Sequence, residues 1–143
     1  MGKTRRGLAS KIVAIADRFG LPLSAILASG ENHEVTLVER TLEQRFTKKK
    51  PQRLIADRAY DSSTLEKSLQ KKGIQLIAPV RRKNKTRHQD GRHLRRYRRR
   101  WKIERLFAWL LRFRRISTRF DRIAQHYLGF VHLGCIVILL RHL

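Results

Sequence analysis

Alternating apolar and polar positions near the start of the chain predict a β-hairpin. Residues 8–17 and 21–29 combine this alternation with β-branched side chains, which favours strands. Asp17, Gly20 and Pro22 mark the turn between them, and all three are common turn residues. The first part of the chain is therefore expected to fold as two antiparallel strands.

The middle of the chain predicts a helix followed by a strand–helix–strand unit. Residues 34–46 carry apolar side chains at helical spacing. Residues 53–57 form a short apolar run, residues 62–72 a capped helix, and residues 74–80 a second apolar run. Because a helix joins the two runs, we expect a βαβ unit with a parallel strand pair, and an α/β fold.

The last third predicts two helices, over 93–113 and 120–142, with a break at 114–119. The basic stretch before them, 81–93, has almost no apolar residue and is expected to be a mobile loop that becomes ordered on phosphate. We find no internal repeat and no long linker, so residues 1–143 are expected to form a single domain.

Glu104 is a carboxylate within a helix crowded with cations. At helical spacing it shares one side with Tyr97, Arg100 and Leu111. It is either a salt-bridge partner of the arginines or a metal ligand in a groove that binds a polyanion, and spacing leaves both open. A neighbouring apolar stripe that can pack on a core is formed by Ile103, Leu106, Phe107 and Leu110.

The net charge of +23 is the unusual feature of the composition. It falls in segments that also carry Trp, Phe and Leu, so it belongs to folded structure, and a polyanion would relieve its self-repulsion. Nucleic acid is the leading partner and an anionic membrane surface the weaker alternative. We expect contacts to the DNA backbone, without reading of bases, from Arg81, Arg82, Lys83, Lys85, Arg87, Arg98, Arg99, Lys102, Arg105 and Arg112.

Some classes of protein are excluded by composition. A single cysteine, Cys135, rules out an internal disulfide and a Cys-rich metal site, and its apolar surroundings predict a packed core residue. The apolar run 127–140 is shorter than a membrane span requires, and no secretory signal is recognisable. We expect no membrane association and a cytoplasmic protein associated with the nucleoid.

Asp57 is the second carboxylate of interest. It ends a buried strand, where ligand sites of open α/β sheets concentrate, although turn chemistry also explains an Asp there. Magnesium takes one or two carboxylates together with phosphate and water. Asp57 and Glu104 could together serve phosphoryl displacement with such an ion.

Several segments together resemble a known family. They are 56–62 (ADRAYDS), 99–105 (RRWKIER), 107–110 (FAWL) and 113–115 (FRR), preceded by 6–12 (RGLASKI), 20–23 (GLPL) and 29–34 (SGENHE). In this order they resemble bacterial insertion-sequence transposases of the DDE type, most closely the IS5-like group. The resemblance covers nearly the whole chain.

The resemblance implies a ribonuclease H-like fold in which three acidic residues bind two Mg²⁺ ions (or Mn²⁺) and DNA is cleaved and joined at element ends. Asp57 matches the second acid of the family and Glu104 its glutamate, so both are the catalytic and metal-binding candidates. Tyr97 and Arg100 match the signature around that glutamate and are expected to position Glu104 or a phosphate.

Two departures from the family pattern stand out. The basic position seven residues after the glutamate is Leu111 here, and the nearest cation is Arg112. The first aspartate has no counterpart in residues 1–5, and Asp17, at a turn, is a poor substitute. We therefore expect the C-terminal portion of a transposase catalytic domain: an incomplete ribonuclease H-like core without its first strand, followed by a helical C-terminal part.

The sequence leaves two main functions open. One is a metal-dependent DNA transposase, incomplete as this chain alone, whose partners are element ends, target DNA, further copies of the chain and the product of an upstream reading frame joined by frameshifting. The other is a catalytically inactive, basic DNA-binding remnant of a transposase. A basic RNA-associated protein is a third, weaker alternative.

Overall fold

The computed structural model describes residues 2–4, 7–80, 91 and 95–143, and it confirms the β-hairpin. Strands β2 (Gly7–Ala16) and β3 (Pro22–Ser29) pair antiparallel from Ser10–Ser29 towards the turn. A short strand that the sequence did not predict, β1 (Gly2–Thr4), pairs antiparallel with the start of β2.

The hairpin turn depends on Asp17 and Gly20. Asp17 Oδ1 accepts hydrogen bonds from the backbone N–H groups of Phe19 (2.7 Å) and Leu21 (2.8 Å). Gly20 has φ +84°, and a Cβ there would lie 2.6 Å from Arg105 Nη2. Glycine is therefore favoured by the backbone conformation, and a larger residue would also displace the end of the Arg105 side chain.

The strand–helix–strand unit is also confirmed. Strands β4 (Arg53–Ile55) and β5 (Gln75–Ile77) pair in parallel, and the 3₁₀ turn η1 (Arg58–Tyr60) and helix α2 (Ser63–Lys71) connect them. Both strands are shorter than predicted, so Asp57 lies just beyond the end of β4. In the described residues the chain has two separate sheets, ordered β1-β2-β3 and β4-β5.

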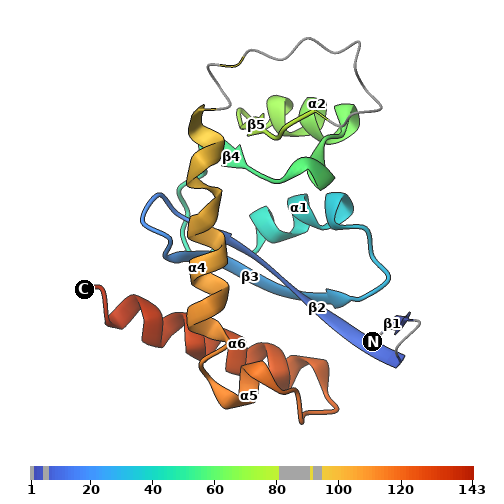
Figure 1. The fold of residues 1–143 in the computed structure, drawn as a ribbon, viewed down its shortest axis with the longest axis vertical. Helices are drawn as coiled ribbons and strands as arrows, with labels where there is room; N and C mark the ends of the chain where they lie inside the picture. Colours follow the sequence, from blue (N-terminus) through green and yellow to red (C-terminus); the bar gives the residue numbers. More distant parts are fainter. Residues whose placement is uncertain (1, 5–6, 81–90, 92–94) are drawn as a thin grey trace.

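Helix α1 (Glu34–Glu43) lies between these two sheets (Figure 1). On one side Leu37 packs with Ile26 of β3. On another side Val38 and Leu42 pack with α2 and the start of β5. Because two apolar faces of one short helix are covered, α1 fixes the βαβ unit against the hairpin.

The C-terminal part differs from the prediction in its boundaries. The predicted helix over 93–113 is observed as a 3₁₀ helix, η3 (Arg95–Arg100), that runs into helix α4 (Trp101–Leu110). A 3₁₀ turn is common at the N-terminus of an α-helix. The predicted break contains a short helix, α5 (Arg114–Ser117), and α6 (Ala124–Leu140) starts later than expected.

The largest core lies between the hairpin and helices α4 and α6. Leu106, Leu110 and Val131 are fully buried there, beside Ala25 of β3. The predicted apolar stripe of α4 is thereby confirmed. Cys135 belongs to the same core, and burial raises its pKa to about 11.

Helix α6 is apolar on all sides, yet the described chain covers only part of it. Leu133, Ile136 and Leu140 are at least half exposed on its outer side. No helix in the described part of the chain is long and apolar enough to cross a membrane.

Candidate functional site

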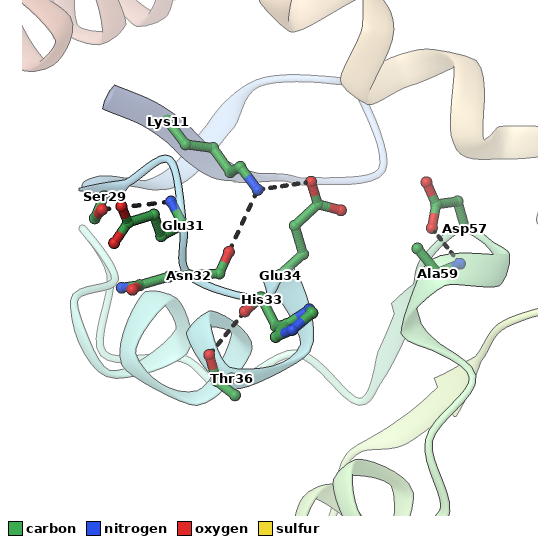
Figure 2. Close-up of polar contacts among 9 residues, drawn as sticks. All are labelled: Lys11, Ser29, Glu31, Asn32, His33, Glu34, Thr36, Asp57 and Ala59. Atoms are coloured by element: carbon green, nitrogen blue, oxygen red, sulfur yellow. Dashed lines mark hydrogen bonds and ion pairs between the residues drawn. The ribbon is translucent and has the colours of Figure 1, made fainter. Parts of the chain in front are cut away.

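Asp57 is held at the end of β4 by the turn that follows it. Its Oδ1 accepts a hydrogen bond of 2.7 Å from the backbone N–H of Ala59, which makes Asp57 the N-cap of η1 (Figure 2). Among the described residues, its other oxygen, Oδ2, has no hydrogen-bond donor. Turn chemistry thus accounts for one of the two carboxylate oxygens.

Tyr60 lies within the electrostatic influence of both Asp57 and Glu34, the first residue of α1. The sequence did not predict this grouping. Burial, and then the negative charges of Glu34 and Asp57, raise the pKa of Tyr60 to about 12. Both carboxylates therefore act on the same phenol, and α1 contacts η1. The two acids come from segments separated by helix α1 and strand β4, so local spacing contained no signal for this grouping.

Lys11 compensates the charge of Glu34. Its Nζ lies 3.2 Å from Glu34 Oε1 and donates a hydrogen bond of 3.4 Å to the carbonyl of Asn32 (Figure 2). His33 is exposed, and its backbone carbonyl accepts a hydrogen bond of 2.7 Å from Thr36 Oγ1. The loop after β3 is thus tied to β2 through Lys11, and the His33 side chain makes no cap hydrogen bond.

Glu104 contacts Arg100, which in turn contacts Tyr97, along η3 and α4. Arg100 Nη2 lies 2.9 Å from Glu104 Oε1, and Arg100 Cζ lies 5.6 Å from the ring centroid of Tyr97. The predicted shared side of these three residues is therefore present. The Glu104 side chain is 59% exposed. Exposed ion pairs of this kind contribute at most about 1 kcal/mol to the free energy of unfolding. The Arg100–Glu104 pair therefore adds little to the stability of the fold.

Asp57 and Glu104 follow two elements that contact each other, β4 and η3. Strand β4 contacts η3, and η3 continues directly into α4. No group of three or more His, Cys, Asp or Glu side chains within the described ranges is arranged to hold a metal ion. The side chains of Asp57 and Glu104 end in carboxylate oxygens, which are the donors that Mg²⁺ and Mn²⁺ accept.

Two of the predicted DNA-binding cations have a role inside the molecule. Lys102 Nζ donates to the carbonyl of Arg18, and Arg105 Nη2 donates to the carbonyl of Phe19. Both side chains therefore hold the hairpin turn against α4. Arg98, Arg99 and Arg112 are exposed to solvent, as contacts to phosphate require. The remaining candidates lie outside the described residues: Arg81, Arg82, Lys83, Lys85 and Arg87.

Arg105 is also stacked between two tryptophans of α4. Its Cζ lies 4.7 Å from the ring centroid of Trp101 and 4.8 Å from that of Trp109. The i, i+4, i+8 spacing of the three residues was the available signal in the sequence. Trp101 is half exposed, and Trp109 packs against the core.

Comparison with known proteins adds to this geometry. The chain is 36% identical over 137 residues to a protein of Burkholderia cepacia named as a transposase for insertion sequence element IS402, and the match covers 90% of this chain but 62% of that protein. It is 31% identical over 135 residues to a protein of Brucella ovis named as a transposase for insertion sequence element IS6501, covering 94% of this chain and all of that protein. No solved structure matches. Residues 2–140 match the family model described as Transposase DDE domain, and the chain therefore belongs to this transposase family.

Proposed function

We propose that this chain carries two of the metal-binding carboxylates of a DNA transposase, Asp57 and Glu104, and acts in cleavage and strand transfer at insertion-sequence ends. The observation that carries the proposal is the contact line Tyr97–Arg100–Glu104 on a segment that adjoins β4. Membership of the DDE transposase family and a net charge of +23 support it. The resemblance to the IS5-like group and a ribonuclease H-like core belong to the same proposal.

The two carboxylates would act through the oxygens that the protein leaves unused. Asp57 Oδ2 has no described donor, and Glu104 makes its ion pair through Oε1. A divalent cation such as Mg²⁺ or Mn²⁺ supplies Lewis-acid stabilisation of a phosphoryl oxygen when it is bound. Arg100 orients the Glu104 carboxylate, and the Tyr97 ring supports the Arg100 guanidinium at 5.6 Å.

The arginines around Glu104 would hold the DNA backbone. Arg98 and Arg99 are exposed immediately before α4, and Arg112 is exposed just after it. Cations at both ends of this helix can neutralise phosphates on either side of the cleaved bond. Element ends and target DNA are thus the proposed partners, more than one copy would act together to pair two ends, and DNA binding would place the chain at the nucleoid.

Replacing Glu104 by Gln tests this function. Glu104→Gln keeps the size of the side chain and removes the charge, so it should lower metal-dependent DNA cleavage roughly 100-fold or more while retaining DNA affinity. Cleavage would be followed on a supercoiled plasmid that carries the element ends, with added Mg²⁺ or Mn²⁺. Glu43→Gln is the matched control, because Glu43 is also an exposed glutamate with a cationic partner, Lys72.

Two results would contradict the proposal. Unchanged cleavage by Glu104→Gln would remove Glu104 from the site. DNA binding without any metal-dependent cleavage, when the unmodified chain is assayed together with the product of the upstream reading frame, would instead favour the catalytically inactive DNA-binding remnant.

A further inference from the structure

The connection between α5 and α6 forms a hollow on the surface of the molecule. Its volume is about 370 Å³, and it is lined by Arg114, Arg115 and Phe120. This volume lies at the lower end of the range of small-molecule sites. In the sequence, the residues of the hollow follow Glu104 after the rest of α4, within and just after α5, and they lie far from Asp57 along the chain.

The hollow combines an exposed aromatic ring with guanidinium groups. Phe120 is 59% exposed. Arg115 Cζ lies 6.0 Å from the ring centroid of Phe120 and 5.5 Å from that of Phe130, so Arg115 is held between two rings. A flat apolar face beside a fixed cation is the arrangement that binds the base and the phosphate of an unpaired nucleotide.

The two arginines of the hollow form no ion pair within the described part of the chain. Neither Arg114 nor Arg115 forms an ion pair there; the pairs present involve Lys11, Lys72 and Arg100. Asp121 follows Phe120 directly, and its Oδ2 is buried without a hydrogen-bond partner among the described residues. An anionic ligand would therefore meet arginines whose charge is still available.

A second aromatic surface, at Trp101, does not have this property. Its neighbours Lys102 and Arg105 already donate to backbone carbonyls of the hairpin turn. At the hollow, by contrast, Arg115 contacts the Phe120 ring, and among the described residues neither Arg114 nor Arg115 forms an ion pair.

We propose that this hollow binds single-stranded DNA, with an unpaired base stacked on Phe120 and its phosphate held by Arg114 and Arg115. The proposal rests on the proposed transposase function, because a strand freed at the cleavage site is the ligand it would receive. Glu104 lies in the first turn of α4 and Leu110 ends that helix, about 9 Å further along its axis. A strand leaving the carboxylates along α4 therefore reaches the end of this helix, four residues before Arg114, within a few nucleotides.

The test measures binding of the whole chain to a fluorescein-labelled single-stranded oligothymidylate of about 15 nucleotides, and to a duplex of the same length, by fluorescence anisotropy. Phe120→Ala should weaken single-strand binding about 5-fold or more and leave duplex binding nearly unchanged, because stacking on a ring needs an unpaired base. Phe46→Ala is the control, since Phe46 is 41% exposed and lies outside the hollow.

A second variant tests the cations separately. Arg115→Gln should lower the slope of log affinity against log salt for the single strand by about 0.7, the value for one lost phosphate contact. Arg40→Gln, an exposed arginine on α1, should leave the slope unchanged.

Unchanged single-strand binding by Phe120→Ala, or an equal loss with the duplex, would overturn the proposal. The cleavage test at Glu104 is independent of this result, because Glu104→Gln should bind the single strand as the unmodified chain does. Failure of the hollow and failure of the transposase function are therefore distinguishable.

Discussion

Gly134 is the position where α6 approaches the helix that carries Glu104, and replacing it by Ala tests that packing. A Cβ at Gly134 would lie 2.7 Å from Ile116 Cδ1, 3.2 Å from Leu110 Cδ2 and 3.4 Å from a ring carbon of Phe113. Leu110 ends α4, and Ile116 belongs to α5. On the same helix, Gly129 has nothing within 4 Å of such a Cβ, so it provides a matched control.

The two substitutions should change the free energy of unfolding in different ways. Gly→Ala within a helix stabilises by about 1 kcal/mol, and Gly129→Ala should show this gain in full. At Gly134 the added methyl group meets Ile116 and Leu110, which are both at least 98% buried and have little room to move. Overpacking of this kind costs about 1–3 kcal/mol, so Gly134→Ala should be neutral or destabilised by up to about 2 kcal/mol.

Thermal unfolding followed by circular dichroism would separate these outcomes. For a chain of 143 residues, 1 kcal/mol corresponds to about 3 °C in Tm. The two variants should therefore differ by roughly 3–10 °C, with Gly129→Ala the more stable. Because the clash is at the end of α4, Gly134→Ala should also lower DNA cleavage. An increase in Tm at Gly134 equal to that at Gly129 would refute the close approach of these helices.

Two further predictions concern a buried hydrogen bond and the response to acid. Tyr127 Oη donates a 2.7 Å hydrogen bond to the buried carbonyl of Ile116, so Tyr127→Phe should lower the free energy of unfolding by about 1–2 kcal/mol; an unchanged Tm would contradict this. The hydrogen bond from Ser68 and the interaction with Lys72 hold the pKa of Glu39 below its ordinary value of 4.5. The contribution of Glu39 to stability is therefore fully present above pH 4.5 and is lost as the pH falls through the lowered pKa, so acid should destabilise the unmodified chain more than Glu39→Gln in denaturant titrations at a series of pH values.

Local pattern was sufficient for most elements of secondary structure. The hairpin, helix α1 and the parallel βαβ unit appear where alternation, helical spacing and turn residues predicted them. Boundaries were less well predicted: β5 and α6 are shorter than expected. The apolar pattern of an element continues into the turns that flank it, while backbone hydrogen bonding ends earlier.

The sequence by itself also determined the line Tyr97, Arg100 and Glu104. These residues are three and four positions apart, so any local helix brings them together regardless of the rest of the fold. The same is true of Arg105 between its two tryptophans. The composition alone gives the net charge of +23, and this charge predicts a polyanionic partner.

Only the tertiary structure decided which cations are engaged and which acids are grouped. Lys102 and Arg105 hold a turn that lies 84 and 86 residues earlier in the chain. Glu34 and Asp57 act on Tyr60 because α1 packs beside η1. Among the described residues, Arg114 and Arg115 at Phe120 form no ion pair. Contacts of this kind depend on how the helices and sheets pack, and the local periodicity of a sequence contains no record of that packing.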